Sequence, residues 1–86
     1  MSAVTIYTRP FCGFCSHALR LLKDKGVDFT EIEAAFDAAK RKEMVERSGG
    51  ATTFPQIFVG DKHIGGCDDL VGLDRAGKFD AMLSAG

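Results

Sequence analysis

Residues 3–15, with the sequence AVTIYTRPFCGFC, place two cysteines directly after an apolar segment. Residues 3–8 are β-branched and aromatic, which is typical of a buried strand, and Pro10 ends that strand. Cys12 stands where a helix should begin, because apolar residues then recur at helical spacing until Gly26 closes the helix. These residues are Phe14, Ala18, Leu21 and Leu22, and we expect them to share one stripe. A strand, a Cys-x-x-Cys pair and a helix in this order indicate redox chemistry.

The middle of the chain predicts a second strand and a second helix. Residues 27–33 begin with the alternation of a strand, and the pattern slips at Glu31. Asp37 is the expected N-cap of a helix that runs through Arg47, and the glycines after Ser48 end it. This βαβ unit predicts a parallel pair of strands.

The last part of the chain predicts a hairpin and further helix. Residues 56–59 and 62–64 flank Gly60-Asp61, a turn signal between two short strands. Asp68-Asp69 suits the positive end of a helix dipole, and later apolar residues allow one or two short C-terminal helices. The predicted order is β-α-β-α-β-β-α(-α) in one α/β domain, residues 1–86, with a small mixed sheet covered by helices.

Composition limits the classes of function. The chain has 86 residues, is 45% hydrophobic and has a net charge of -1, which gives no basic face for nucleic acid or for a membrane surface. Its apolar runs are too short for a membrane span or a signal peptide. The three cysteines, an odd number, fit a secreted disulfide framework poorly. We therefore expect a cytoplasmic protein, where paired thiols are usually catalytic or metal-binding.

The two cysteines of the pair are predicted to differ. Cys12 lies at a helix N-terminus, where unpaired N–H groups favour negative charge, and Arg9 adds a positive charge nearby. Cys15 lies one turn inside the helix and should be more buried and less ionised. Cys12 is therefore the expected nucleophile and Cys15 the resolving thiol.

Two other interpretations of the cysteines carry less weight. A closed zinc site needs four ligands, usually in two spaced pairs, and the chain offers one pair, an isolated Cys67 and two separated histidines. His17 and His63 are both expected at the surface rather than as metal ligands. Cysteines can also be no more than small packed hydrophobes, but the strand–Cys-x-x-Cys–helix context favours a redox pair. No protein metal site is therefore expected.

Three motifs resemble the glutaredoxin family, most closely its short bacterial dithiol members. They are YTRPFCGFC at residues 7–15, TFPQIF at 53–58 and GGCDDL at 65–70, and together they span most of the chain. The resemblance implies a thioredoxin-like fold with a four-stranded mixed sheet and a cis proline at position 55. It also implies glutathione as co-substrate, in a monomeric oxidoreductase that reduces glutathionylated and disulfide-containing proteins.

The same resemblance implies a set of contacts to glutathione. Arg9 faces the glycine carboxylate, with Arg41 as a further candidate, and the backbone before Pro55 pairs with the cysteine of glutathione as an added strand. The helix start at Cys67 takes the γ-glutamyl carboxylate, and an aspartate meets the ammonium. The expected binding residues are Arg9, Phe14, Thr53, Phe54, Pro55, Cys67, Asp68 and Asp69.

The residues between the cysteines leave a second function open. Dithiol relatives usually carry Pro-Tyr there, whereas Gly13-Phe14 is the pattern of single-cysteine relatives that bind a [2Fe–2S] cluster. The alternative is therefore an iron–sulfur carrier or sensor, a dimer with Cys12 and glutathione as cluster ligands. Cys15 favours the oxidoreductase. Cys67 is a third thiol beside the site, and a regulatory role is a further hypothesis for it.

Overall fold

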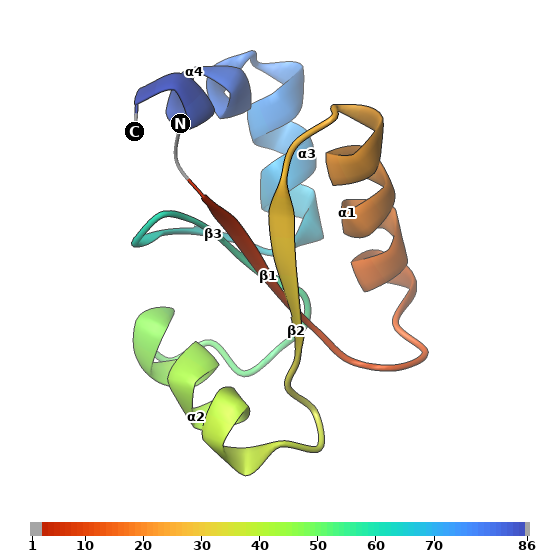
Figure 1. Ribbon diagram of the computed structural model, residues 1–86, viewed down its shortest axis with the longest axis vertical. Helices are drawn as coiled ribbons and strands as arrows, with labels where there is room; N and C mark the ends of the chain where they lie inside the picture. The colour runs from red at the N-terminus through yellow and green to blue at the C-terminus, as the bar shows by residue number, and fades with distance from the viewer. Residues whose placement is uncertain (1–2, 86) are drawn as a thin grey trace.

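The chain forms a four-stranded mixed sheet with helices on both faces, as Figure 1 shows. The structure is a computed structural model that describes residues 3–85, so residues 1, 2 and 86 of the expected domain lie outside the described residues. The elements are β1 (Val4–Thr8), α1 (Gly13–Asp24), β2 (Phe29–Glu33), α2 (Ala38–Arg47), β3 (Gln56–Val59), β4 (Lys62–Gly65), α3 (Cys67–Arg75) and α4 (Lys78–Ala85). The sheet order is β2-β1-β3-β4, with β1 parallel to β2 and antiparallel to β3, which pairs antiparallel with β4. The predicted element order and mixed sheet are confirmed.

Alternation along the two central strands divides the core between the two faces of the sheet. Ile6 and Ile57 pack with Ala18, Leu22 and Leu70 on the face covered by α1 and α3. The opposite face carries a second cluster under α2, formed by Tyr7, Phe58, Ala34 and Met44. Figure 1 shows α1 and α3 together and α2 apart from them. The central strands β1 and β3 are therefore held from both sides, and β1 is a rigid support for the loop that follows it.

Two helices begin where the sequence predicted, and a side chain caps each of them. Cys12 is the N-cap of α1, and its sulfur accepts a hydrogen bond from the backbone N–H of Cys15 at 3.2 Å. Asp37 is the N-cap of α2, and its Oδ1 accepts from Ala39 N and Lys40 N, both at 3.1 Å. Each cap satisfies helix N–H groups that have no partner inside the helix. At α1 the capping atom is the sulfur itself, so helix geometry fixes the place of the first thiol.

The second strand begins two residues later than predicted. Gly26 has a positive φ of 68°, its N–H donates to Lys23 O at 3.0 Å, and the N–H of Val27 donates back to Leu22 O at 3.1 Å. This pair of bonds is the Schellman motif that ends many helices. Val27 and Asp28 therefore belong to the end of α1 and the loop after it, and β2 starts at Phe29.

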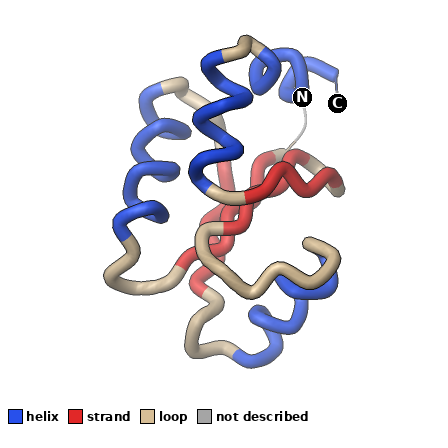
Figure 2. The backbone as a smooth tube through the Cα atoms, turned by 180° about the vertical axis from the view of Figure 1, so that it is seen from behind, coloured by secondary structure: helices blue, strands red, loops and turns tan. Residues whose placement is uncertain are grey.

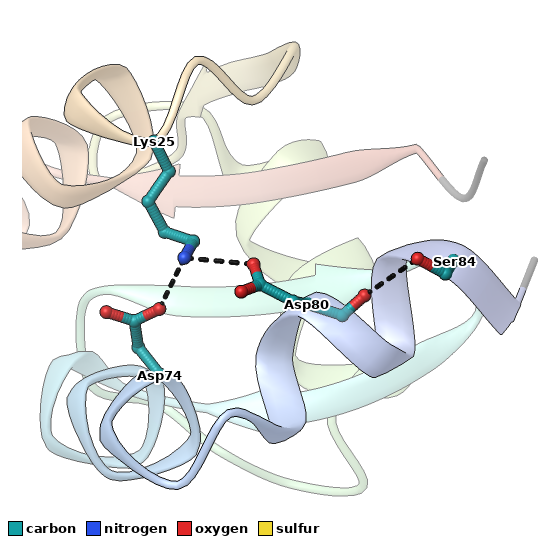
Figure 3. A network of polar contacts seen from close by, with 4 residues as sticks. All are labelled: Lys25, Asp74, Asp80 and Ser84. Carbon is teal, nitrogen blue, oxygen red and sulfur yellow. Dashed lines mark hydrogen bonds and ion pairs between the residues drawn. The ribbon is translucent and has the colours of Figure 1, made fainter.

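Lys25 is the C-cap of α1, and its side chain joins α1 to α3 and α4 at the end of α1 remote from the cysteines (Figure 3). Its ammonium lies 2.7 Å from Asp74 Oδ1 and 2.9 Å from Asp80 Oδ1, which come from α3 and α4. The hydrogen bond to Asp74, followed by that to Asp80, raises the pKa of Lys25 above its ordinary value.

Within residues 3–85 no helix is both long and apolar enough to span a membrane.

Candidate active site

The two cysteines lie at the junction of the β1–α1 loop and α1, and both are nearly covered. Cys12 is 6% exposed and Cys15 is 3% exposed. The sulfur of Cys12 also contacts the carbonyl oxygen of Phe54 at 4.0 Å, on the loop before β3. The first thiol is thus held between the N-terminus of α1 and the backbone of a distant loop. Cys15 is the more buried of the two, as predicted.

The electrostatics of the thiols discourage ionisation of more than one of them. Burial, followed by the side-chain hydrogen bond with Cys12, raises the pKa of Cys15 from its ordinary 9.0 to about 12. Burial also raises the pKa of Cys67, with smaller contributions from the charges of Asp68 and Cys12. Burial, with the influence of Cys12 added to it, therefore keeps Cys15 and Cys67 in the neutral thiol form at neutral pH.

A groove of about 350 Å³ runs beside the cysteines, between the loop before β3 and the start of α3. Figure 2 shows that loop passing next to the connection from β4 to α3. The residues lining the groove are Phe14, Ala51, Thr53, Phe54, Pro55, Gln56, His63, Gly65, Gly66, Cys67, Asp68 and Asp69. A hollow of about 610 Å³ lies between α4 and the strands β1 and β2, but no cysteine lines it. The smaller groove is the one within reach of thiol chemistry.

Seven of the eight residues expected to bind glutathione line this groove. They are Phe14, Thr53, Phe54, Pro55, Cys67, Asp68 and Asp69. The peptide bond before Pro55 is cis, as the resemblance implied. Phe14 is 63% exposed, so it stands apart from the buried part of the α1 stripe, which contains Ala18 and Leu22. Its ring is instead available to a molecule in the groove.

The two aspartates at the start of α3 have different surroundings. Asp69 Oδ2 accepts a hydrogen bond from Gly66 N at 2.9 Å and so caps the helix. Gly65 has φ 115°, and a Cβ on it would overlap the carboxylate of Asp69. Asp68 is exposed and makes no hydrogen bond or ion pair within residues 3–85. Asp69 therefore shapes the helix start, and Asp68 is the carboxylate left to face a ligand.

Arg9, the remaining predicted residue, lies outside the groove lining. Its Nη1 donates to the carbonyl oxygens of Pro10 at 3.3 Å and of Phe11 at 3.4 Å, within its own loop. Arg41 is exposed on α2 and does not line the groove either. Phe11, beside the first cysteine, has a positive φ of 55° and is fully exposed. This loop presents a cation and an aromatic ring next to Cys12.

Gln56 and His63 also line the groove, and neither was predicted to contact glutathione. Gln56 is 4% exposed, and both polar atoms of its side chain make hydrogen bonds. His63 was predicted at the surface rather than as a metal ligand; its ring lines the groove and is half-buried against Phe58, with ring centroids 5.0 Å apart. A signal was present in the sequence, because Gln56 is a polar residue at the start of an apolar strand, and a polar side chain buried there needs hydrogen-bond partners.

No group of three or more histidine, cysteine or acidic side chains that could hold a metal ion occurs within residues 3–85. The described residues instead offer a Cys-x-x-Cys pair at a helix N-terminus, with cis-Pro55 and the carbonyl of Phe54 beside the first sulfur. On a four-stranded mixed sheet this arrangement is thioredoxin-like, and its chemistry is thiol–disulfide exchange.

Comparison with known proteins identifies the family within this thioredoxin-like class. The Glutaredoxin family model matches residues 4–64. A glutaredoxin of Pseudomonas aeruginosa is 52% identical over 85 residues, covering 99% of this chain and 100% of the relative. The solution structure of glutaredoxin from Brucella melitensis has a TM-score of 0.82 and 53% identity, covering 96% of this chain and 89% of that one. A buckwheat glutaredoxin–glutathione complex has a TM-score of 0.83 and 30% identity, covering 95% and 76%. The chain belongs to the glutaredoxin family and is a thiol–disulfide oxidoreductase.

Proposed function

We propose that this enzyme takes its electrons from glutathione and reduces glutathionylated proteins and protein disulfides. The observation that carries the proposal is the position of Cys12, whose sulfur touches the Phe54 carbonyl at the edge of the groove. A glutathione lying in that groove has its sulfur within reach of Cys12. The likeness to a glutaredoxin solved with glutathione supports the same ligand.

The groove offers complementary groups to each part of glutathione. The Thr53–Phe54 backbone pairs with the cysteine residue of the tripeptide as a short added strand. The N–H groups at the start of α3, at Cys67 and Asp68, receive the γ-glutamyl carboxylate, and the Asp68 carboxylate meets the ammonium. Phe14 packs against the ligand from α1. Arg9 supplies the positive charge for the glycine carboxylate once its side chain leaves the carbonyl oxygens of its own loop.

The reaction with a glutathionylated protein uses Cys12 alone. The Cys12 thiolate attacks the glutathione sulfur, the new Cys12–glutathione disulfide forms, and the protein sulfur leaves as a thiolate that takes up a proton. A second glutathione thiolate attacks the bound glutathione sulfur and releases the Cys12 thiolate. The protein–glutathione mixed disulfide is thereby reduced, and the glutathione taken from the substrate leaves bonded to one free glutathione as glutathione disulfide.

The reaction with a protein disulfide also needs Cys15. Cys12 first forms a mixed disulfide with the substrate, which removes the negative charge and the hydrogen-bonding thiolate that hold the Cys15 proton in place. The pKa of Cys15 then falls, because only burial and the opposing influence of Arg9 remain. Cys15 loses its proton and attacks Cys12, and the substrate leaves as a dithiol. The resulting Cys12–Cys15 disulfide is reduced by two glutathiones.

The test is steady-state turnover of a glutathionylated peptide and of a protein disulfide, with glutathione as reductant. Cys12→Ser should abolish both activities. Cys15→Ser should keep the first activity and lose the second. Turnover near that of the unaltered enzyme in Cys12→Ser, or loss of both activities in Cys15→Ser, would reject the two-branch mechanism.

The cluster-binding alternative requires more than one chain. Cys12 is the only cysteine proposed to ligate it, and residues 3–85 contain no group able to hold a metal by themselves. A [2Fe–2S] cluster would need the Cys12 sulfurs of two chains and two glutathiones. Anaerobic purification with glutathione decides between the oxidoreductase and the cluster carrier. A colourless, iron-free monomer fits the oxidoreductase, and a brown dimer that loses its iron in Cys12→Ser fits the carrier.

The proposed reaction belongs in the reducing cytoplasm, where glutathione keeps thiols reduced.

A further inference from the structure

A chain of hydrogen bonds links His63 to the loop before β3. His63 Nε2 lies 2.6 Å from Gln56 Oε1, and Gln56 Nε2 lies 2.9 Å from the carbonyl oxygen of Thr53 and 3.1 Å from Thr53 Oγ1. Gln56 is 4% exposed, whereas His63 is half-buried and Thr53 is exposed, so the carboxamide lies at the buried centre of these bonds. Every donor and acceptor of the Gln56 carboxamide is thereby used, except for a second lone pair on its oxygen.

The direction of each bond follows from the only group that cannot change roles. The Thr53 carbonyl oxygen can only accept, so the Gln56 atom that faces it is the NH₂ group. Gln56 Oε1 then faces His63 and can only accept, so His63 Nε2 must carry a proton. This assigns the neutral imidazole to the Nε2–H tautomer.

The Thr53 carbonyl sets the orientation of the peptide group that is proposed to pair with glutathione. The Thr53 carbonyl and the Phe54 N–H belong to one planar trans peptide group and point in opposite directions. Holding the carbonyl oxygen in place therefore fixes the direction of the Phe54 N–H. The next carbonyl, that of Phe54, contacts the Cys12 sulfur at 4.0 Å. The hydrogen-bond chain from His63 thus ends one residue before the carbonyl that contacts Cys12.

The support behind His63 is rigid. Its ring packs on Phe58 with centroids 5.0 Å apart, and Phe58 contacts the Tyr7 ring edge-on at 5.6 Å. The Arg47 guanidinium lies 4.3 Å from the centroid of the Phe58 ring, while its Nη1 donates to Tyr7 Oη at 2.8 Å. The imidazole is therefore positioned by the sheet and by α2 and does not depend on the loop that it orders.

We propose that His63 is a positioning residue which, through Gln56, orients the Thr53–Phe54 peptide group for glutathione. The inference rests on the proposed function for its ligand. Removing the donor leaves a buried amide oxygen unpaired, or lets the carboxamide turn and face the Thr53 carbonyl with its own oxygen. Either result lets the Thr53–Phe54 peptide group rotate, so glutathione loses a preformed partner strand.

The test compares three variants in glutathione-dependent turnover. His63→Leu removes the donor, His63→Gln restores an N–H group at a similar reach, and Lys62→Ala changes an exposed neighbour on the same strand. We expect His63→Leu to raise the KM for glutathione about tenfold, as loss of one buried hydrogen bond predicts, with little change in kcat. His63→Gln should recover most of the loss, and Lys62→Ala should resemble the unaltered enzyme. An unchanged KM in His63→Leu, or equal damage in His63→Leu and His63→Gln, would overturn the proposal.

Two spectroscopic readouts do not depend on activity. In the unaltered protein without glutathione, ¹⁵N NMR at alkaline pH should show His63 as the Nε2–H tautomer, and an Nδ1–H tautomer would overturn the proposal even if His63→Leu fails to fold. The Phe54 amide resonance should shift in His63→Leu and return in His63→Gln. If the enzyme proves not to use glutathione, the proposed function fails, while these signals still decide whether His63 orders the peptide group.

Discussion

The coupling between the two active-site thiols gives the sharpest quantitative prediction. The pKa of Cys15 is raised from its ordinary 9.0 to about 12 by burial and then by its hydrogen bond with Cys12. At pH 7 the thiolate form of Cys15 is therefore about one part in 10⁵, against about one part in 100 for a thiol with the ordinary value. Replacing Cys12 by serine removes the hydrogen-bonding sulfur and the thiolate charge. The pKa of Cys15 should then fall, although burial, the largest cause, still raises it.

The assay is a ¹³Cβ NMR titration of Cys15 in the reduced enzyme and in Cys12→Ser. Cys67→Ser is the matched control, because it removes another buried thiol that is not among the causes of the Cys15 shift. Titration of Cys15 at its ordinary value in the reduced enzyme, or a higher pKa in Cys12→Ser, would refute the coupling. It would also remove the reason for assigning the resolving step to a thiol that becomes reactive only after Cys12 is occupied.

Other predictions concern pH, the start of α3 and the helix junction. Because the folded-state pKa of Cys15 lies above its unfolded value, the reduced protein should lose stability in denaturant titrations as pH rises from about 9 toward 12, and Cys15→Ser should lose less. Gly65→Ala should lower the free energy of unfolding by roughly 1–3 kcal/mol and weaken glutathione binding, because φ is 115° and the new Cβ would overlap Asp69; a matched Gly13→Ala change, which meets no atom, should bind glutathione normally. Lys25→Met should lower Tm slightly, by a margin that shrinks in high salt, and a salt-independent loss would show that packing rather than the ion pairs to Asp74 and Asp80 is at work.

Local signals were sufficient to predict most of the fold. The apolar segment before Pro10, the Asp37 cap and the Gly60-Asp61 turn each act within a few residues, and the structure confirms the elements that they predicted. The start of β2 was placed too early because Val27 resembles a strand residue. Its N–H instead bonds to Leu22 O in the Schellman motif that ends α1. Hydrophobic alternation alone does not predict whether such an N–H bonds to the helix or to a neighbouring strand.

The site was only partly predictable for a similar reason. Residues in contiguous motifs, such as Thr53–Pro55 and Cys67–Asp69, were found because the resemblance carries them together, and they line one groove. The contacts of His63 were not predictable because they depend on strand pairing: β4 sets it opposite Phe58 and within reach of Gln56. The sequence also could not show that Asp69 caps α3 while Asp68 stays exposed, since two adjacent aspartates at a helix start look equivalent in sequence.

The most direct test of the account is to trap its first covalent intermediate. Cys15→Ser enzyme would be treated with glutathione disulfide, and its peptides would be mapped by mass spectrometry. The account predicts one glutathione per chain, bound to Cys12, and its release by added glutathione. Modification of Cys67 in place of Cys12, or no stable adduct at all, would contradict the assignment of Cys12 as the nucleophile beside a glutathione groove.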